Sequence, residues 1–183
     1  MNYFLLFIIK TLRYLLKPLS FLPALFMIYT IFSFSSQPGP ESASLSYQVS
    51  KILVLAYNKI MAKGYSNDIL NELILLIHPF VRKSAHFSEY FILAVTVAFP
   101  LYVYKIRGIF LFLIGGIFCV FIAFFDEYQQ SFVSGRVSSF KDVGIDSAGI
   151  FCGILCTWLL CYLGRKTIFQ WLSLEQYRKT NKK

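Results

Sequence analysis

Residues 108–127, GIFLFLIGGIFCVFIAFFDE, decide the fold class. Residues 108–125 carry no charge, and a helix that crosses a bilayer needs about 20 mostly apolar residues. Two acids, Asp126 and Glu127, follow directly. Charged groups at the edge of hydrocarbon are costly unless they are paired or hydrated, so an acidic cluster there is a candidate functional site. This stretch therefore predicts a membrane-spanning helix with a polar site at its end.

The whole chain has the composition of an integral membrane protein. Of its 183 residues 57% are hydrophobic and 19% aromatic, and only 15% are charged, against about 25% in soluble domains. Three further segments are long and apolar enough to span a bilayer. We therefore predict an all-α integral membrane bundle of four transmembrane helices, at about residues 19–35, 86–104, 108–126 and 144–163.

The remaining residues flank or connect these spans. Residues 1–18 form an apolar and basic N-terminal segment, residues 19–163 the transmembrane domain, and residues 164–183 a basic tail. The outer segment 36–84 opens with a proline-rich turn and then shows amphipathic patterns at 50–61 and 69–77. These patterns predict separate interfacial helices, in the outer membrane interface or folded over the bundle. Pro79 would then start the helix that enters the second span.

The distribution of Lys and Arg predicts the orientation. Residues 1–18, the short connection after the second span and the tail are rich in basic residues, and of the nine acids only Glu175 lies there. Because basic loops stay in the cytoplasm, we expect both termini to be cytoplasmic in a multi-pass protein of the cell membrane. The net charge of +9 then reflects topology and contact with membrane lipid, and we expect no nucleic-acid partner.

Titratable residues gather at the predicted outer ends of three spans. Side chains three and four apart share a helix face, which groups His86 with Glu89 and Asp142 with Asp146. The small residues Gly149 and Gly153 continue the second stripe and permit close helix packing, so the acids should face the bundle. The candidate catalytic residues are His86, Glu89, Asp126, Glu127 and Asp142. The candidate substrate- or anion-binding residues are Lys83, Tyr90, Gln130, Arg136 and Asp146.

This cluster is compatible with several kinds of chemistry. Crowded carboxylates suit acid–base catalysis, imidazole and carboxylates suit a divalent metal, and arginine suits an anion. The same charges could instead form an ion-pair network that only fixes the outer helix ends. The sequence leaves open whether the protein is an enzyme, and it leaves the metal, cofactors and oligomeric state undetermined.

Three ordered stretches resemble the motifs of VanZ-like membrane proteins. They are RKSAHFSEY at residues 82–90, DEYQQSFVSGR at 126–136 and DVGIDSAG at 142–149. Ser134 departs from the pattern, because family members often have proline before the Gly-Arg pair. The resemblance implies a small bacterial envelope protein, and it implies an association with reduced susceptibility to the glycopeptide teicoplanin.

Three functions follow as expectations. The first is a VanZ-like envelope protein whose polar, outward-facing site binds an envelope precursor or a glycopeptide-related ligand, with a link to teicoplanin-type antibiotic resistance. The second is a membrane-embedded hydrolase or transferase acting on a lipid-linked or phosphorylated envelope substrate. The third is a non-catalytic membrane scaffold held together by a structural ion-pair network.

Overall fold

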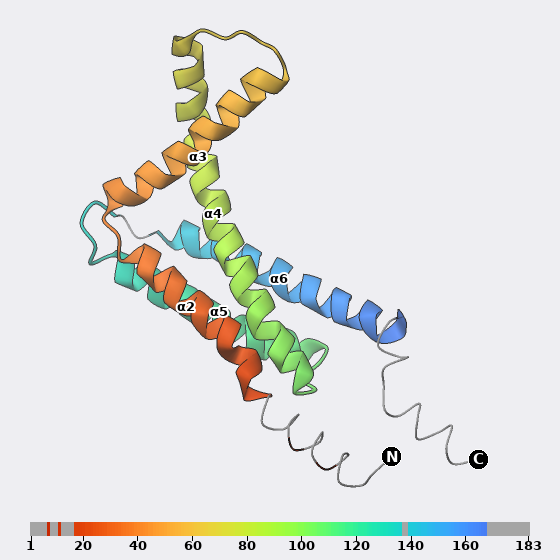
Figure 1. Cartoon of the computed structure of the whole chain (residues 1–183). Helices are drawn as coiled ribbons and strands as arrows, with labels where there is room; N and C mark the ends of the chain where they lie inside the picture. The colour runs from red at the N-terminus through yellow and green to blue at the C-terminus, as the bar shows by residue number, and fades with distance from the viewer. Residues whose placement is uncertain (1–6, 8–10, 12–16, 137–138, 168–183) are drawn as a thin grey trace.

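The protein is helical in the computed structural model, which describes residues 7, 11, 17–136 and 139–167 (Figure 1). The N-terminal segment 1–18 and the tail 164–183 of the sequence prediction lie largely outside these residues. In chain order the elements are the 3₁₀ helix η1 (Pro18–Phe21) and the α-helices α2 (Leu22–Ser35), α3 (Gly39–Ile60), α4 (Asn67–Val103), α5 (Ile109–Gln130) and α6 (Phe140–Thr167).

Four helices are long and apolar enough to cross a membrane, which confirms the predicted fold class. These candidate spans are Pro18–Ser35, Asn67–Val103, Ile109–Gln130 and Lys141–Gly164. Local sequence explains how some of the helices start. Proline stands in the first turn of η1, α2 and α3, where its missing N–H needs no partner. Gly108, with φ of +57°, supplies the left-handed conformation from which α5 begins.

α4 is the centre of the bundle and packs against α2, α5 and α6. Its buried stripe includes Tyr90, Leu93, Ala94 and Val97, which belong to one apolar cluster with residues of the other three helices. The stripe repeats at three- and four-residue intervals, as expected for one face of a helix. This shared core positions the polar residues in the middle of α4 and at the adjacent ends of α5 and α6.

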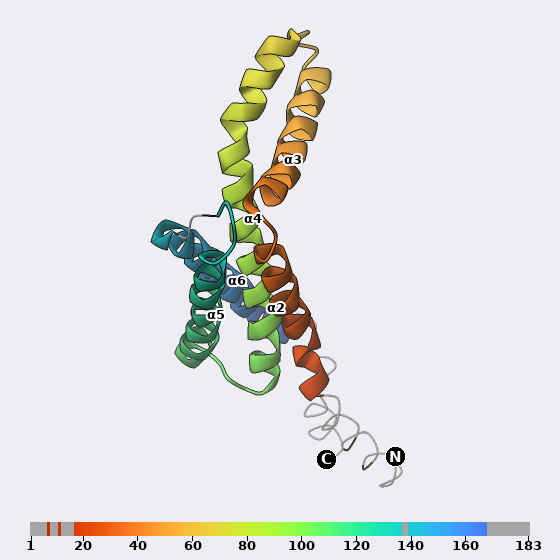
Figure 2. The same ribbon diagram turned by 90° about the vertical axis from the view of Figure 1, so that its left-hand side faces the viewer.

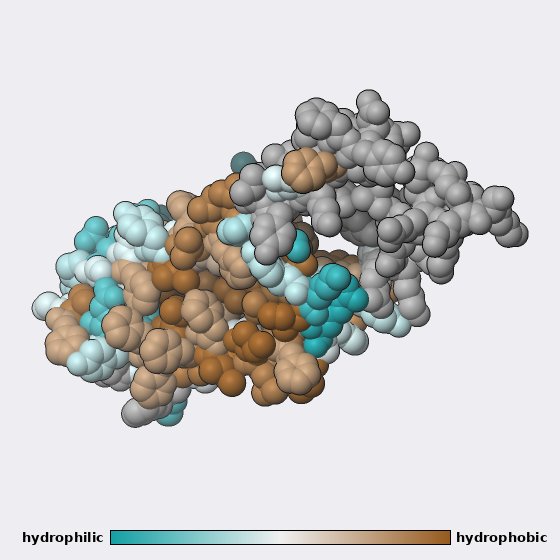
Figure 3. All heavy atoms as spheres, turned by 90° about the horizontal axis from the view of Figure 1, so that it is seen from below, coloured by the Kyte–Doolittle hydropathy of each residue, from teal (hydrophilic) through white to brown (hydrophobic). Residues whose placement is uncertain are grey.

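The outside of the bundle is apolar. Most large side chains of α5 are exposed, among them Phe110, Ile117, Phe121 and Phe124. Figure 3 shows brown, hydrophobic side chains over the middle of one face, with hydrophilic residues on its left-hand and right-hand sides. A soluble protein rarely exposes such a continuous apolar surface, whereas lipid tails match it.

The outer segment differs from the sequence prediction. Two separate interfacial helices were expected at 50–61 and 69–77, but α3 covers Gly39–Ile60 and the second pattern is the start of α4. The two pack antiparallel through Val54, Leu70 and Ile74, and this α3–α4 hairpin extends away from the bundle (Figure 2). With 37 residues, α4 is about 55 Å long, well beyond the roughly 30 Å of a hydrocarbon core.

Pro79 does not start a helix, contrary to the sequence prediction. It lies inside α4, as does Pro100. The carbonyl that its missing N–H leaves without a partner belongs to Leu75, a residue that is 64% exposed. The helix continues through Pro79 because the residues on both sides are held by tertiary packing, against α3 before it and against the bundle after it.

The start of α2 and the end of α4 lie at the same end of the bundle, as the distribution of basic residues predicts. The Lys17 ammonium lies 5.6 Å from the centre of the Tyr104 ring, and the Arg107 guanidinium lies 5.1 Å from the Tyr102 ring. The connections α2–α3 and α5–α6 lie at the opposite end (Figure 1). We call this opposite end, which carries the motif residues, the hairpin end.

Candidate functional site

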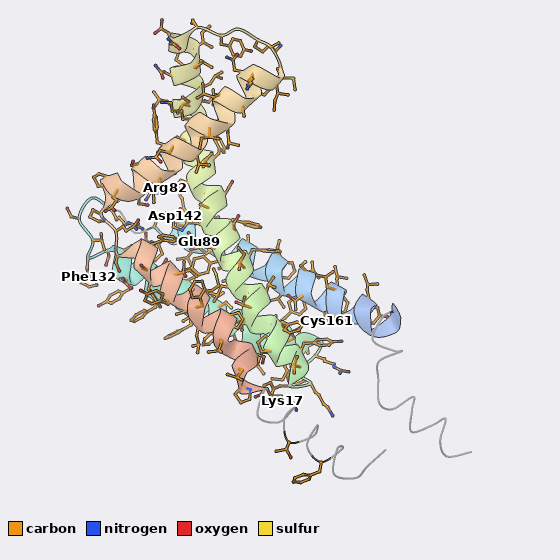
Figure 4. The ribbon with its side chains drawn as sticks, in the orientation of Figure 1. Lys17, Arg82, Glu89, Phe132, Asp142 and Cys161 are labelled. Atoms are coloured by element: carbon orange, nitrogen blue, oxygen red, sulfur yellow. The ribbon has the colours of Figure 1, made fainter. Side chains whose placement is uncertain are left out.

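Three helices bring the predicted side chains together at the hairpin end. His86 on α4 lies within electrostatic reach of Asp126 on α5 and Asp142 on α6. Glu89 similarly faces Asp126 and Arg136. In Figure 4 the labelled Arg82, Glu89 and Asp142 lie close to one another beside the junction of α3, α4 and α6. Residues from all three motifs thus meet in one region.

The floor of this region is a buried polar layer. Tyr90 and Asp146 are 0% exposed and Asp126 is 1% exposed. The Gln130 amide nitrogen donates to Asp126 Oδ2 at 2.9 Å and to Ser35 Oγ at 3.2 Å. The Tyr90 hydroxyl faces the Asp126 carboxyl, and within the part of the chain that the structure describes both Asp146 oxygens have no hydrogen-bond partner. Buried polar groups normally have hydrogen-bond partners, so the Asp146 carboxyl is an exception in this layer.

Close packing of α6 on α4 holds the acids in this layer. Gly149 lies against the backbone of Phe87, and Gly153 against that of Phe91, where a side chain would collide with the carbonyl oxygen. The prediction that these glycines permit close approach is confirmed. Asp146 lies one turn before Gly149, so the packing turns its carboxyl toward the bundle and away from lipid.

Glu127 has a structural contact of its own. Its Oε2 accepts a hydrogen bond of 2.9 Å from the backbone N–H of Ser139, the residue before α6. Free N–H groups at a helix start need such acceptors. Glu127, predicted as a candidate catalytic residue, therefore anchors the α5–α6 connection.

Arg136 binds the end of α2. Its Nη2 donates to the carbonyl of Phe34 at 2.7 Å and its Nε to that of Gln37 at 3.0 Å. Burial lowers the pKa of the Arg136 guanidinium, but a guanidinium remains charged in proteins. Among the described residues the acids and bases of this end form no ion pair. Arg136 therefore holds the end of α2 through carbonyl groups.

The two connections of the hairpin end are also tied through their backbones. The N–H of Gly39 donates to the carbonyl of Ser134 at 3.1 Å. Gly39 lies against the backbone of Gly135, which leaves no room for a side chain. Gly135 has a φ of +74°, a conformation that glycine adopts without steric cost. The α2–α3 turn and the α5–α6 turn are therefore joined into one layer beside the buried acids.

A cavity of about 650 Å³ opens between this layer and the α3–α4 hairpin. Its charged or titratable lining residues are Arg82, His86, Glu89 and Arg136. Gln37, serines and apolar side chains form the rest. The Nδ1 atom of His86 is buried without a hydrogen-bond partner among the described residues. His86 and Glu89 thus stand between the cavity and the buried layer.

Several predicted residues have other positions. Lys83 is exposed and does not line the cavity, whereas its neighbour Arg82 does. Tyr90, Asp126, Gln130 and Asp146 lie behind the cavity wall. In the described ranges no three His, Cys, Asp or Glu side chains are arranged to hold a metal ion.

Sequence reasoning missed the serines of the site and the role of His78. The Nε2 atom of His78 lies 2.9 Å from Ser46 Oγ and 3.2 Å from the carbonyl oxygen of Ala43, so this side chain ties α4 to α3. The available signal was the spacing of Ser42, Ser46 and Ser50, which are four apart and therefore share one face of α3. Ser42 and Ser46 line the cavity.

Four apolar helices with a charged cavity at one end define a multi-pass membrane protein. Comparison with protein families identifies it further. The family model VanZ/LLP1 matches residues 20–161, which is more than half of the chain, and the chain belongs to this family. No curated protein and no solved structure matches the chain.

Proposed function

We propose that this chain is a protein of the bacterial cytoplasmic membrane that binds a polar envelope ligand at the outer face and lowers susceptibility to teicoplanin-type glycopeptides. The antibiotic link comes from its family. The main support for a binding site is the cavity, because residues of the first two motifs line it and Asp146 of the third motif lies behind that lining. Ligand sites are typically concave, mostly apolar and furnished with a few convergent polar groups.

The proposed orientation places both termini in the cytoplasm and the hairpin end outside. It is supported by the gathering of Lys17, Lys105 and Arg107 at the end opposite the acids, since basic loops are retained inside. A ligand from the cell wall or from the outer leaflet would then reach the cavity without crossing the membrane.

The test is a deletion strain complemented with single variants. We expect His86→Asn and Glu89→Gln to leave the strain as susceptible to teicoplanin as the deletion, with normal protein levels in the membrane. Lys51→Gln is the control, because Lys51 is exposed on α3 and does not line the cavity. Equal susceptibility of the deletion strain and the wild type would remove the antibiotic link.

A second candidate function is a membrane-embedded hydrolase or transferase. The observation that favours it is the position of His86 and Glu89 at the cavity, with Asp126 behind them. An imidazole and a carboxyl group in one water-poor site can exchange a proton with a bound substrate. The purified protein, incubated in vesicles of extracted envelope lipid, should release a headgroup or phosphate that mass spectrometry detects. The Glu89→Gln variant should bind the lipid but release nothing.

A further inference from the structure

The two walls of the cavity are formed by α3 and α4, and the lining residues of both walls become less polar from the bundle toward the hairpin tip. On α3, Ser42 and Ser46 lie near the bundle and Leu53 lies toward the hairpin tip. On α4 the order is reversed in sequence, with Ile77 toward the tip and Arg82 and later polar residues near the bundle. The helices are antiparallel, because Ser46 contacts His78 whereas Val54, later in α3, packs with residues earlier in α4. The polar parts of the two walls thus lie side by side. The cavity is therefore polar at its bundle end and apolar at its tip end.

The lining of the polar end has more guanidinium than carboxyl groups. Two guanidinium groups, Arg82 and Arg136, and one carboxyl group, Glu89, line it. Among the described residues Arg82 has no hydrogen bond or ion pair. Arg136 uses only N–H groups of Nε and Nη2 on carbonyl oxygens, so the other donors of its guanidinium stay available. Unused guanidinium donors at one end of a cavity match phosphate or carboxylate oxygens.

Apolar side chains at the tip end of the cavity are about half exposed. Leu53 is 51% exposed and Val49 is 47% exposed, and both line the cavity on the tip side of the Ser46–His78 contact. The α3 wall from Ser42 to Leu53 rises about 16 Å at 1.5 Å per residue. A groove of that length can shelter an extended hydrocarbon chain, and its burial is favourable because it removes apolar surface from water.

We propose that this cavity binds an amphiphile with an anionic headgroup, such as a phosphate or carboxylate, at Arg82 and Arg136, and with its hydrocarbon chain along Val49 and Leu53. The inference names the ligand class of the site in the proposed function and rests on that function only for its biological setting. Neither a free anion nor a neutral lipid uses both ends of the cavity. Charge complementarity at one end and exposed apolar walls at the other together select the amphiphile.

Photo-crosslinking tests the proposal with the full chain in nanodiscs of neutral phosphatidylcholine. The probe is dodecyl phosphate with a diazirine at the chain terminus, and the labelled peptides are mapped by mass spectrometry. We expect labelling within Gly39–Ile60 and at the start of α4. The trimethylammonium analogue should label these peptides at least about tenfold less, the factor corresponding to roughly 1.4 kcal/mol. Unlabelled dodecyl phosphate should compete, and inorganic phosphate should not.

Matched variants address the two ends separately. Arg82→Gln should lower the labelling about tenfold and Lys51→Gln should not. Leu53→Trp, which fills the apolar end, should lower it too, whereas Ile52→Trp on an exposed face that does not line the cavity should leave it unchanged. Val49→Trp repeats the test at the next turn, and size-exclusion profiles identify variants that misfold.

Equal labelling by the cationic analogue, equal competition by inorganic phosphate, or label spread over the lipid-facing surface of α5 would each overturn the proposal. Labelling as expected in a protein that has no effect on teicoplanin susceptibility would remove only the proposed function. Loss of the susceptibility effect in His86→Asn, with normal labelling in Arg82→Gln and Leu53→Trp, would remove only this inference.

Discussion

Gly153 on α6 lies so close to Phe91 on α4 that a β-carbon at Gly153 would stand 2.5 Å from the Phe91 carbonyl oxygen. One turn earlier Gly149 meets Phe87 in the same way. This backbone contact sets how near α6 comes to α4, and it therefore sets the position of Asp146 behind the cavity.

Gly153→Ala should destabilise the bundle by about 1–3 kcal/mol, because the added methyl group forces two helix backbones apart. The measurement is the unfolding midpoint of the purified protein in mild detergent. Gly144→Ala on the same helix is the control, since nothing lies within 4 Å of a β-carbon there, and alanine favours helix. Equal effects of the two substitutions would contradict a close packing of α6 on α4.

The glycine contact was predictable from sequence, whereas the path of α4 was not. Spacing alone places Gly149 and Gly153 on the face of the acids, and a small residue on such a face means close approach. The path of the chain at Pro79 was not predictable in this way. The local rule ends or starts a helix at proline, but packing of Leu70 and Ile74 against α3 keeps the preceding turns helical. That packing depends on tertiary structure, which periodicity does not show.

Glu127 provides a test of structural against catalytic roles. Glu127→Ala removes the acceptor of the Ser139 N–H and should cost about 1 kcal/mol of stability, as for other lost helix caps. Glu127→Gln keeps an acceptor oxygen, so most of the stability and most of the teicoplanin effect should remain. An equal loss of function in both variants, with Glu127→Gln fully stable, would show that the charge itself is needed.

His78 should hold the hairpin closed over the cavity. His78→Ala loses the contacts with Ser46 and Ala43, and a typical hydrogen bond contributes about 0.5–1.5 kcal/mol. Backbone amides of α3 should then exchange with deuterium several-fold faster, while those of α5 stay unchanged. His78→Gln, which can still bond Ser46, should restore most of the protection. Unchanged exchange in His78→Ala would mean that apolar packing alone closes the hairpin.

The candidate site was only partly predictable. Helix periodicity groups His86 with Glu89, and the predicted ends of the spans place Asp126 at the same end of the bundle. The structure brings the three together. The sequence does not show that Arg136 binds carbonyl groups at the end of α2, because that contact joins residues about 100 positions apart. The departure at Ser134 has a simple physical account. Its contact with Gly39 uses the backbone carbonyl, which proline also has, so either residue preserves the tie.

Cysteine labelling tests the orientation on which the outward-facing site depends. In a background where Cys119, Cys152, Cys156 and Cys161 are replaced, single cysteines would be placed at Lys63 in the hairpin loop and at Arg107 between α4 and α5. Both positions are exposed. A membrane-impermeant maleimide should label Lys63→Cys in intact protoplasts and Arg107→Cys only after permeabilisation, because basic connections face the cytoplasm. The reverse pattern would open the cavity to the cytoplasm. It would remove the route by which a glycopeptide or cell-wall precursor reaches His86, while an anionic amphiphile could still bind from the inner leaflet.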